Sequence, residues 1–170
     1  MRAIESDRDE ITAAVRQVVA DNPWYTVDQF ASQVHGRYRH NMRLRYDYVL
    51  SRIGPLDGKT VIDVGCGDGQ WSALLCSRFA VKLIGIDYNE LRLDRYRRRL
   101  PAAEALLGTC AKIPVESGAA DLVMCHQVLE HLGDPAAALI EARRVLKPNG
   151  MLLVFIPFRL VGEVWPVVNP

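Results

Sequence analysis

The sequence has few of the features that place a chain in a membrane or an oxidising compartment. Its longest apolar run is MLLVFI at 151–156, far short of the ~20 residues that span a bilayer. The opening MRAIESDRDE lacks the charged and then apolar layout of a signal peptide. No C-x-x-C motif or zinc-type spacing joins the four cysteines, Cys66, Cys76, Cys110 and Cys125. We therefore expect a cytoplasmic protein with reduced, mostly buried thiols.

The chain also lacks an excess of charge of either sign. Its 21 Lys and Arg residues balance 20 Asp and Glu residues, and the net charge of +1 provides no field to attract nucleic acid. We interpret the densest basic cluster, LRLDRYRRRL at 91–100, as the solvated face of a helix. With 170 residues and 49% apolar content, the chain can form one domain with a core. Neither nucleic acid nor a membrane is the expected partner.

The most informative stretch is VIDVGCGDGQW at 61–71. Four strand-forming residues lead directly into Gly65, Gly67 and Gly69, and a helix-compatible run follows. Glycines at this spacing permit a sharp turn and let a ligand approach the main chain at a helix N-terminus. A second apolar strand, KLIGID, then ends at Asp87, 22 positions after Gly65. An acid at that place can accept hydrogen bonds from ribose hydroxyls.

The glycine spacing distinguishes between two kinds of nucleotide site. A dinucleotide fold uses G-x-G-x-x-G, whereas this chain has G-x-G-x-G with Gln70 and Trp71 where the third glycine would stand. A bulky Trp71 suits a ligand without phosphates. Asp63, two residues before Gly65, would repel a pyrophosphate but attract a cationic amino group. The pattern therefore favours a cationic nucleoside over a dinucleotide.

Five consecutive blocks of the sequence resemble the class I S-adenosylmethionine-dependent methyltransferases that act on small molecules. The blocks are VIDVGCGDG, LIGIDYNELRL, GTCAKIPVESGAADLV, CHQVLEHLGDP and RVLKPNGMLLVFIP, within residues 56–157. The resemblance implies S-adenosyl-L-methionine as the cofactor, with S-adenosyl-L-homocysteine as its product. It also implies a small-molecule substrate.

The arrangement of helical and strand patterns predicts an α/β fold, a three-layer, doubly wound and mostly parallel sheet of the Rossmann-like methyltransferase type with N-terminal helices. Helical spacing of Ile11, Val15, Val18 and Val19 indicates a first helix, Thr26 with Gln29 a second, and the face from Met42 to Ile53 a third. Strands are expected at Thr60–Val64, Leu83–Ile86, Ala105–Gly108, Asp121–Cys125 and Met151–Ile156. Asp134 and Pro135 should open the last helix, and Lys147–Gly150 should turn it into the final strand. We divide the chain into a helical cap at 1–55, a cofactor-binding core at 56–157 and a short tail at 158–170.

The tail is shorter than the region that follows the fifth strand in the resembled family, so C-terminal strands are expected to be shortened or missing. The fifth strand would then be an apolar edge that invites pairing. Three explanations remain open: a truncated or shortened domain, which we favour, a homodimer that covers the edge, or a non-catalytic relative.

The resemblance implies a role for each residue near the expected cofactor. Asp87 should bind the ribose diol, and Asp63 should hold the amino group directly or through water; the alternative for Asp63 is to fix the loop. Gly65, Cys66 and Gly67 form the turn against which the cofactor lies. Tyr88 should face the adenine, although a merely half-buried aromatic is an open alternative. Cys110 stands where the family often has an acid for the adenine amino group, and the main-chain N–H of Ala111 can still read the ring.

A dedicated catalytic residue is optional, because positioning alone can lower a barrier by ~7–11 kcal/mol. If one exists, we expect it in CHQVLEHL at 125–132. His126 should contact the cofactor at the tip of the fourth strand, and His131, a few residues further on, is the candidate base or merely a support for the loop. No metal is expected, because Gln127 replaces the first carboxylate of the Glu-x-x-Glu-His pattern that some relatives carry before Glu130 and His131.

The acceptor is not encoded in any motif. An O-methyltransferase is favoured over an N- or C-methyltransferase. Two alternatives stay open, a non-catalytic member of the fold that serves as a binding module and, less favoured, a nicotinamide-dependent oxidoreductase. Residues of the helical cap are candidates for substrate contacts: Tyr25, His35, Tyr38, Arg39 and His40.

Overall fold

The computed structural model describes residues 8–21, 44 and 46–156. Five strands pair in parallel throughout, in the spatial order β3-β2-β1-β4-β5. Their bounds are β1 Thr60–Val64, β2 Lys82–Asp87, β3 Glu104–Leu107, β4 Ala120–His126 and β5 Leu146–Phe155. The expected parallel α/β sheet is confirmed. β1 has the predicted bounds, and the other four strands begin and end at residues other than those predicted.

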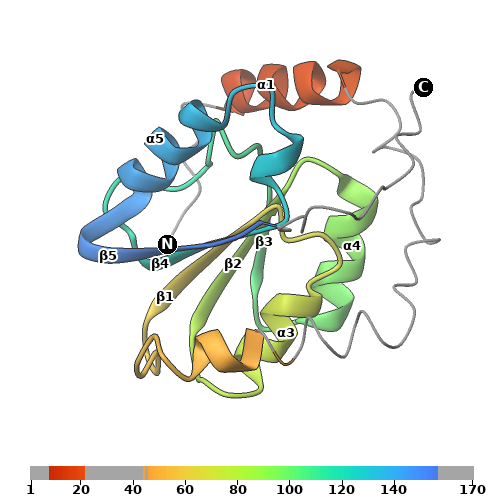
Figure 1. Ribbon diagram of the computed structural model, residues 1–170. Helices are drawn as coiled ribbons and strands as arrows, with labels where there is room; N and C mark the ends of the chain where they lie inside the picture. The colour runs from red at the N-terminus through yellow and green to blue at the C-terminus, as the bar shows by residue number, and fades with distance from the viewer. Residues whose placement is uncertain (1–7, 22–43, 45, 157–170) are drawn as a thin grey trace, which may run out of the picture.

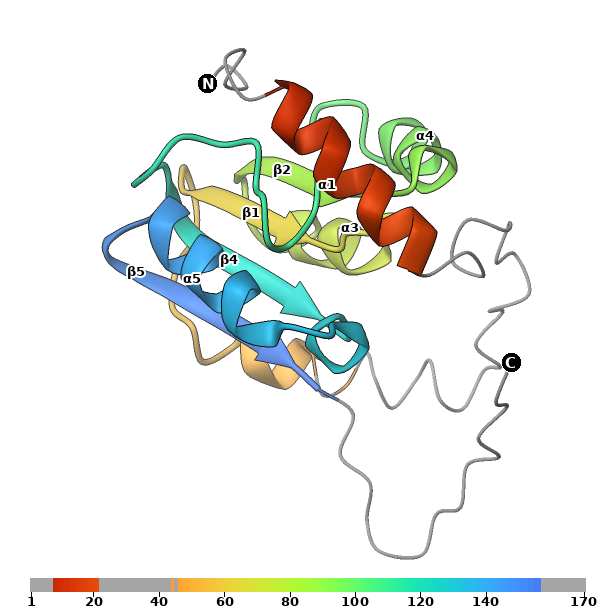
Figure 2. The ribbon, with the colours of Figure 1, turned by 90° about the horizontal axis from the view of Figure 1, so that it is seen from above.

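Helices cover both faces of this sheet. The helices are α1 Arg8–Asp21, α3 Gln70–Cys76, α4 Glu90–Arg99 and α5 Pro135–Val145, with a short 3-10 helix η4 at Leu129–His131. Figures 1 and 2 show α1 and α5 on one face and α3 and α4 on the other, so the molecule has the three expected layers. None of the described helices is long and apolar enough to cross a membrane.

Alternate residues of the strands supply two core clusters, one on each face. The face under α3 and α4 buries Val61, Leu83, Leu122 and Met124 with Leu75 and Leu93 of the helices. The opposite face buries Ile62, Ile84 and Val123 with Ala142 and Val145 of α5. Because side chains alternate along a strand, Asp63 and His126 belong to the α3 side of the sheet.

The order of the strands creates a switch point between β1 and β4. From β1 the chain proceeds outward to β2 and β3, and then returns to the other side of β1 as β4. The carboxyl ends of all five strands lie at one edge, and ligands of open α/β sheets bind there, at the switch point. Gly65 follows β1 and His126 ends β4, so both lie at this point.

Two helices begin with side-chain caps. The Asp134 carboxylate accepts hydrogen bonds from the Ala136 and Ala137 amides at 3.0 and 3.1 Å, and Pro135 occupies the first turn of α5. Both features confirm the predicted start of α5. Asn89 caps α4 in the same way, accepting from Leu91 and Arg92.

The expected turn at 147–150 lies inside a strand. β5 begins at Leu146, and its pairing with β4 moves from Ala120↔Leu146 to Leu122↔Met151. The extra residues form a bulge, in which Asn149 has a φ of +64°. The predicted turn is therefore wrong: these turn-forming residues kink a strand that has already begun.

The N-terminal predictions are tested only in part. Ile11 and Val15 of α1 are buried, as are Tyr46 and Leu50 in the helical stretch at 46–50, which agrees with the predicted faces. The second helix predicted at Thr26, the cap residues proposed for substrate contact and the tail at 158–170 lie outside the described residues. The division at 55 and 157 stays a prediction.

Candidate functional site at the carboxyl ends of the strands

The glycine turn after β1 is held by hydrogen bonds within the protein. The amides of Gly65 and Cys66 both donate to the Ile86 carbonyl of β2, at 2.8 and 3.0 Å. The Gly67 amide donates to Asp87 Oδ2 at 2.9 Å. Gly65, Gly67 and Gly69 all have positive φ, which side chains rarely adopt. The amides of Gly65, Cys66 and Gly67 already donate hydrogen bonds within the protein. The turn therefore offers a ligand space, but not a set of free donors for a phosphate.

Side chains from two other elements approach the turn. A Cβ at Gly65 would collide with Val128, and one at Gly67 would lie 3.4 Å from the guanidinium of Arg92. Gly65 is therefore required by close approach as well as by its φ angle, whereas at Gly67 the φ angle alone favours glycine.

Asp87 ends β2 and faces the turn. It is 5% exposed; Oδ1 accepts a hydrogen bond from the Asn89 amide, and Oδ2 accepts the one from Gly67, both at 2.9 Å. Burial raises its pKa, an effect that these amide bonds and nearby Arg92 partly oppose. The Tyr88 amide also acts on this carboxylate. Because a carboxylate has about four acceptor positions, Asp87 retains acceptor capacity for a ribose hydroxyl.

Asp63 lies on the neighbouring strand and is 2% exposed. Its Oδ2 accepts a hydrogen bond from Ser72 Oγ of α3 at 2.5 Å. Burial raises the pKa of Asp63 to about 6, with Ser72 opposing the rise and Asp87 adding to it. A buried carboxylate of this kind is stabilised by a cation, which is the property expected of a residue that holds an ammonium group.

The other residues predicted to contact the cofactor lie around the same edge. Cys66 is buried, its side chain belongs to the core under α3, and burial raises its thiol pKa well above the usual range. Tyr88 follows Asp87 and is half-buried. Cys110 is half-buried in the turn after β3, where burial raises its pKa to about 12, and Ala111 beside it is exposed. Neither thiol is therefore ionised at neutral pH.

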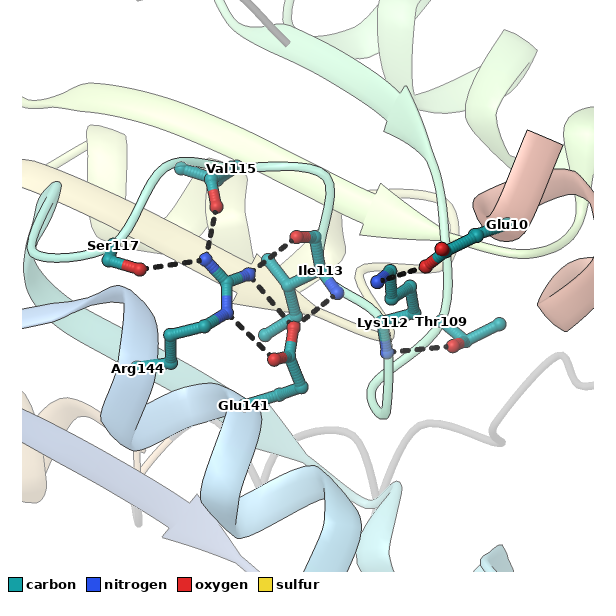
Figure 3. A network of polar contacts seen from close by, with 8 residues as sticks. All are labelled: Glu10, Thr109, Lys112, Ile113, Val115, Ser117, Glu141 and Arg144. Carbon is teal, nitrogen blue, oxygen red and sulfur yellow. Dashed lines mark hydrogen bonds and ion pairs between the residues drawn. The ribbon is translucent and has the colours of Figure 1, made fainter. Parts of the chain in front are cut away.

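The segment after Ala111 is fastened to α5 by a polar network, shown in Figure 3. Arg144 donates to the carbonyls of Ile113 and Val115 at 2.8 and 2.9 Å and pairs with Glu141 at 2.7 Å. Glu141 in turn accepts from the Ile113 amide at 2.9 Å. On the other side of the turn, Lys112 pairs with Glu10 of α1 at 2.7 Å. Two helices thus position the loop that carries Cys110 and Ala111.

His126 ends β4 inside an aromatic cluster. Its ring stacks on Trp71 of α3, with centroids 4.2 Å apart and planes at 26°, and lies 4.8 Å from Phe155 and 6.1 Å from Tyr46. The residue is 7% exposed, and neither ring nitrogen has a hydrogen-bond partner among the described residues. Burial lowers the pKa of His126 to about 4, so the imidazole is neutral at pH 7.

His131 differs from His126 in its surroundings. It is exposed at the end of η4, and its amide donates to the Val128 carbonyl at 2.9 Å. Gln127 lies between the two histidines with a φ of +54°, and Glu130 is exposed. Within residues 8–21, 44 and 46–156, no group of three His, Cys, Asp or Glu side chains is placed to hold a metal ion.

These residues fit S-adenosylmethionine in chemistry. The cofactor carries a ribose diol for Asp87, an ammonium group for Asp63 and a neutral adenine for the loop after β3. The buried and unpartnered nitrogens of His126 lie at the same edge and fit a polar ligand at the switch point.

Several residues of the site were missed by reasoning from the sequence. Packing of α3 and α4 on the sheet brings Ser72 to Asp63 and Tyr96 to Ser72. Val128, in the loop after β4, lies against Gly65, and Arg92 of α4 lies near Gly67. One local signal was available. A glycine inside a strand, Gly85, indicates that a bulky side chain lies against it.

The chain is similar in sequence to known methyltransferases. Residues 62–154 match the model of the methyltransferase domain family. A protein of Mycolicibacterium smegmatis, named as a probable S-adenosylmethionine-dependent methyltransferase, is 36% identical over 68% of this chain and 45% of its own length. The ubiquinone biosynthesis O-methyltransferase of Sodalis glossinidius is 33% identical over 75% of this chain and 51% of its own. The chain thus spans about half the length of these relatives.

A solved structure supports the fold. The crystal structure of the [4+2]-cyclase SpnF superimposes with a TM-score of 0.65 at 24% identity, covering 78% of this chain and 53% of that one. The family match covers more than half of the chain, and the parallel sheet has the strand order on which the site depends. The chain therefore belongs to the class I S-adenosylmethionine-dependent methyltransferases.

Proposed function

We propose that this protein binds S-adenosylmethionine at the carboxyl ends of β1, β2 and β4 and transfers its methyl group to a small molecule. The proposal is carried by one observation: two buried acids, Asp63 and Asp87, flank a glycine turn whose amides are already paired. That combination suits a cationic nucleoside and is unfavourable for a pyrophosphate.

Each part of the cofactor has a candidate partner. Asp87 accepts hydrogen bonds from the ribose diol, and Asp63 accepts one from the ammonium group. The turn at Gly65, Cys66 and Gly67 leaves room for the part of the cofactor that joins the ribose to the amino acid. Tyr88 contacts the adenine, and the loop at Cys110 and Ala111 reads its edge. The bound cofactor would supply a methyl group activated by a sulfonium, so the protein has only to align an acceptor and exclude water.

His126 and His131 are assigned different tasks. A pKa of about 4 makes His126 a weak base at neutral pH, and its burial among aromatic rings fits a contact with the cofactor or the acceptor. His131 is exposed and can be reached by an acceptor, so it is the candidate base for an acceptor that must lose a proton. His131→Ala should leave cofactor affinity nearly unchanged and slow transfer only with such an acceptor.

Oxygen is the acceptor atom we favour, and the O-methyltransferase named above supports this choice. The helical cap at 1–55 is proposed to cover the cofactor and contribute to the acceptor pocket. The core proposed at 56–157 contains every residue assigned to the cofactor.

Calorimetric titration with S-adenosylhomocysteine and with NAD tests the proposal. We expect micromolar or tighter binding of S-adenosylhomocysteine, none of NAD, and methyl transfer with at least one acceptor from a panel of phenols, acids and amines. Binding without transfer across the panel would favour the alternative of a non-catalytic binding module. Preference for NAD would favour an oxidoreductase, and failure to bind either would refute the proposal.

A further inference from the structure

We propose that Ser72 and Tyr96 are positioning residues that hold Asp63 in the state that binds the amino group of the cofactor. The proposal rests on the function proposed above and extends it to two residues that do not contact the cofactor. Ser72 Oγ donates to Asp63 Oδ2 at 2.5 Å, and the Tyr96 hydroxyl donates to Ser72 Oγ at 3.3 Å. All three side chains are buried.

The sheet is built to admit this chain of hydroxyls. Asp63 of β1 pairs in register with Gly85 of β2, and the missing side chain at Gly85 is replaced by the ring of Tyr96 from α4. The same ring lies against Gly69, where a Cβ would come within 2.8 Å of it. Two glycines on different elements therefore make room for one phenol beside the acid.

Burial alone would explain a tyrosine ring in this place, but not its hydroxyl. A phenylalanine fills the same space without a polar atom that has to be paired. Tyr96 directs its hydroxyl to Ser72, whose own hydrogen is given to Asp63. A hydroxyl that accepts one hydrogen bond is polarised and donates a stronger one, so Tyr96 reinforces the bond from Ser72 to Asp63.

The acid needs this support because its surroundings are unfavourable to charge. Five titratable side chains of the described residues interact electrostatically with Asp63, and none of the five carries a positive charge: Tyr46, Cys66, Asp87, Tyr96 and Cys125. Of the effects on its pKa, burial and Asp87 raise it, and the Ser72 hydroxyl lowers it. Ser72 therefore keeps Asp63 ionised to a lower pH than it would otherwise be.

The test measures the affinity for two probes between pH 5 and 8 by calorimetry. S-adenosylhomocysteine carries the amino group, whereas 5′-methylthioadenosine keeps the nucleoside and lacks the amino acid. The ratio of the two affinities isolates Asp63 from Asp87, which faces the part that both probes share. His126 does not interfere, because its pKa of about 4 lies below this range.

In the wild type, the ratio should rise with pH through about 6 and then level off, as Asp63 ionises. Ser72→Ala should move this midpoint to higher pH and lower the ratio about tenfold at pH 6, with 5′-methylthioadenosine unaffected. Tyr96→Phe, which keeps the ring, should have a smaller effect in the same direction. The double variant should lose little more than Ser72→Ala, because Tyr96 acts through Ser72.

Two controls separate this role from a general loss of structure. Ser77→Ala removes an exposed hydroxyl that donates to the Leu74 carbonyl near the end of the same helix, and should leave the affinity ratio and its midpoint unchanged. Asp63→Asn should abolish the pH dependence. An unchanged midpoint in Ser72→Ala, in a folded protein that binds S-adenosylhomocysteine, would overturn the inference and leave the proposed function standing. If the wild type binds neither probe, the proposed function itself fails.

Discussion

At the scale of single residues, Asp87 serves the loop as well as the proposed ligand. Its two oxygens already accept amide hydrogens from Gly67 and Asn89. Removing the carboxyl group would leave both amides unpaired in a buried place and disturb the glycine turn. An alanine variant therefore cannot separate binding from folding, and the isosteric amide is the better choice.

We predict that Asp87→Asn lowers affinity for S-adenosylhomocysteine by roughly 10- to 100-fold, the range for a lost hydrogen bond to a charged group. The measurement is calorimetry with S-adenosylhomocysteine and with its 2′-deoxy analogue. The wild type should discriminate strongly between the two ligands, and the variant should not. Equal discrimination by both proteins would show that Asp87 does not hold the ribose.

His126 predicts a pH dependence of stability. Its pKa is about 4 in the folded protein and near 6.5 when unfolded, so its contribution is complete above pH 6.5 and is lost as the pH falls towards 4. At pH 5 the loss should be about 2 kcal/mol. Asp63 titrates in the same pH range, so the effect of His126 is measured as a difference between two proteins. Between pH 7.5 and 5, urea unfolding should show that the wild type loses about 2 kcal/mol more than His126→Phe, which retains the aromatic stacking. The exposed His131→Phe is the control, and should behave as the wild type does.

Asp63 has the opposite influence on stability. Raising its pKa from 3.8 to about 6 corresponds to a cost of about 3 kcal/mol for the ionised form, present above pH 6 and relieved as the pH falls towards 3.8. Asp63→Asn should therefore raise the free energy of unfolding at pH 8 while weakening S-adenosylhomocysteine binding. A variant that is less stable at pH 8 and binds normally would contradict both expectations.

At the scale of elements, α5 positions a loop as well as covering the sheet. Burial opposes the ionisation of Glu141, but hydrogen bonds from Arg144 and from the Ile113 amide outweigh it and lower its pKa. The pair is therefore charged at neutral pH. It anchors the segment between the proposed adenine contacts and β4, as Figure 3 shows.

We predict that Arg144→Met lowers the free energy of unfolding by about 2 kcal/mol, because it leaves the carbonyls of Ile113 and Val115 without this donor and removes the cation paired with Glu141. Arg143→Met changes the exposed neighbour on the same helix and should stay within about 0.5 kcal/mol of the wild type. Thermal and urea unfolding measure both. If the two variants lose equal stability, the network of Arg144 has no special importance.

At the scale of the whole molecule, a single sheet joins two core clusters. Leu75 belongs to the cluster under α3, Ile62 to the one under α5, and both are fully buried. Strand residues alternate between the two faces, so neither cluster can open without disturbing the strands that it shares with the other.

We therefore predict one unfolding transition for the described core. Leu75→Ala and Ile62→Ala should each lower its free energy by roughly 2–5 kcal/mol, and circular dichroism and tryptophan fluorescence should give coincident curves. Leu91→Ala, on the exposed side of α4, should have little effect. Separate transitions for the two probes would show that the layers unfold independently.

The sequence alone determined the parts of the site that depend on neighbouring residues. Short local patterns predict four features: the glycine turn, the acids at 63 and 87, the cap of α5 and the alternation of strands and helices. They can do so because backbone propensity and capping act over a few residues. The bulge in β5 cannot be told from a turn in the sequence, because the same residues form both and only pairing with β4 distinguishes them.

The tertiary structure decided what surrounds those residues. Packing of α3 and α4 on the sheet brings Ser72 and Tyr96 to Asp63 and stacks Trp71 on His126. Pairing of neighbouring strands brings Phe155 close to His126 and the amides of the glycine turn to the Ile86 carbonyl of β2. Burial, and with it the charge of each acid and imidazole, depends on elements far apart in the chain. For that reason the sequence predicts the family of the protein, whereas the protonation states of the acids and the imidazole in its site follow only from the tertiary structure.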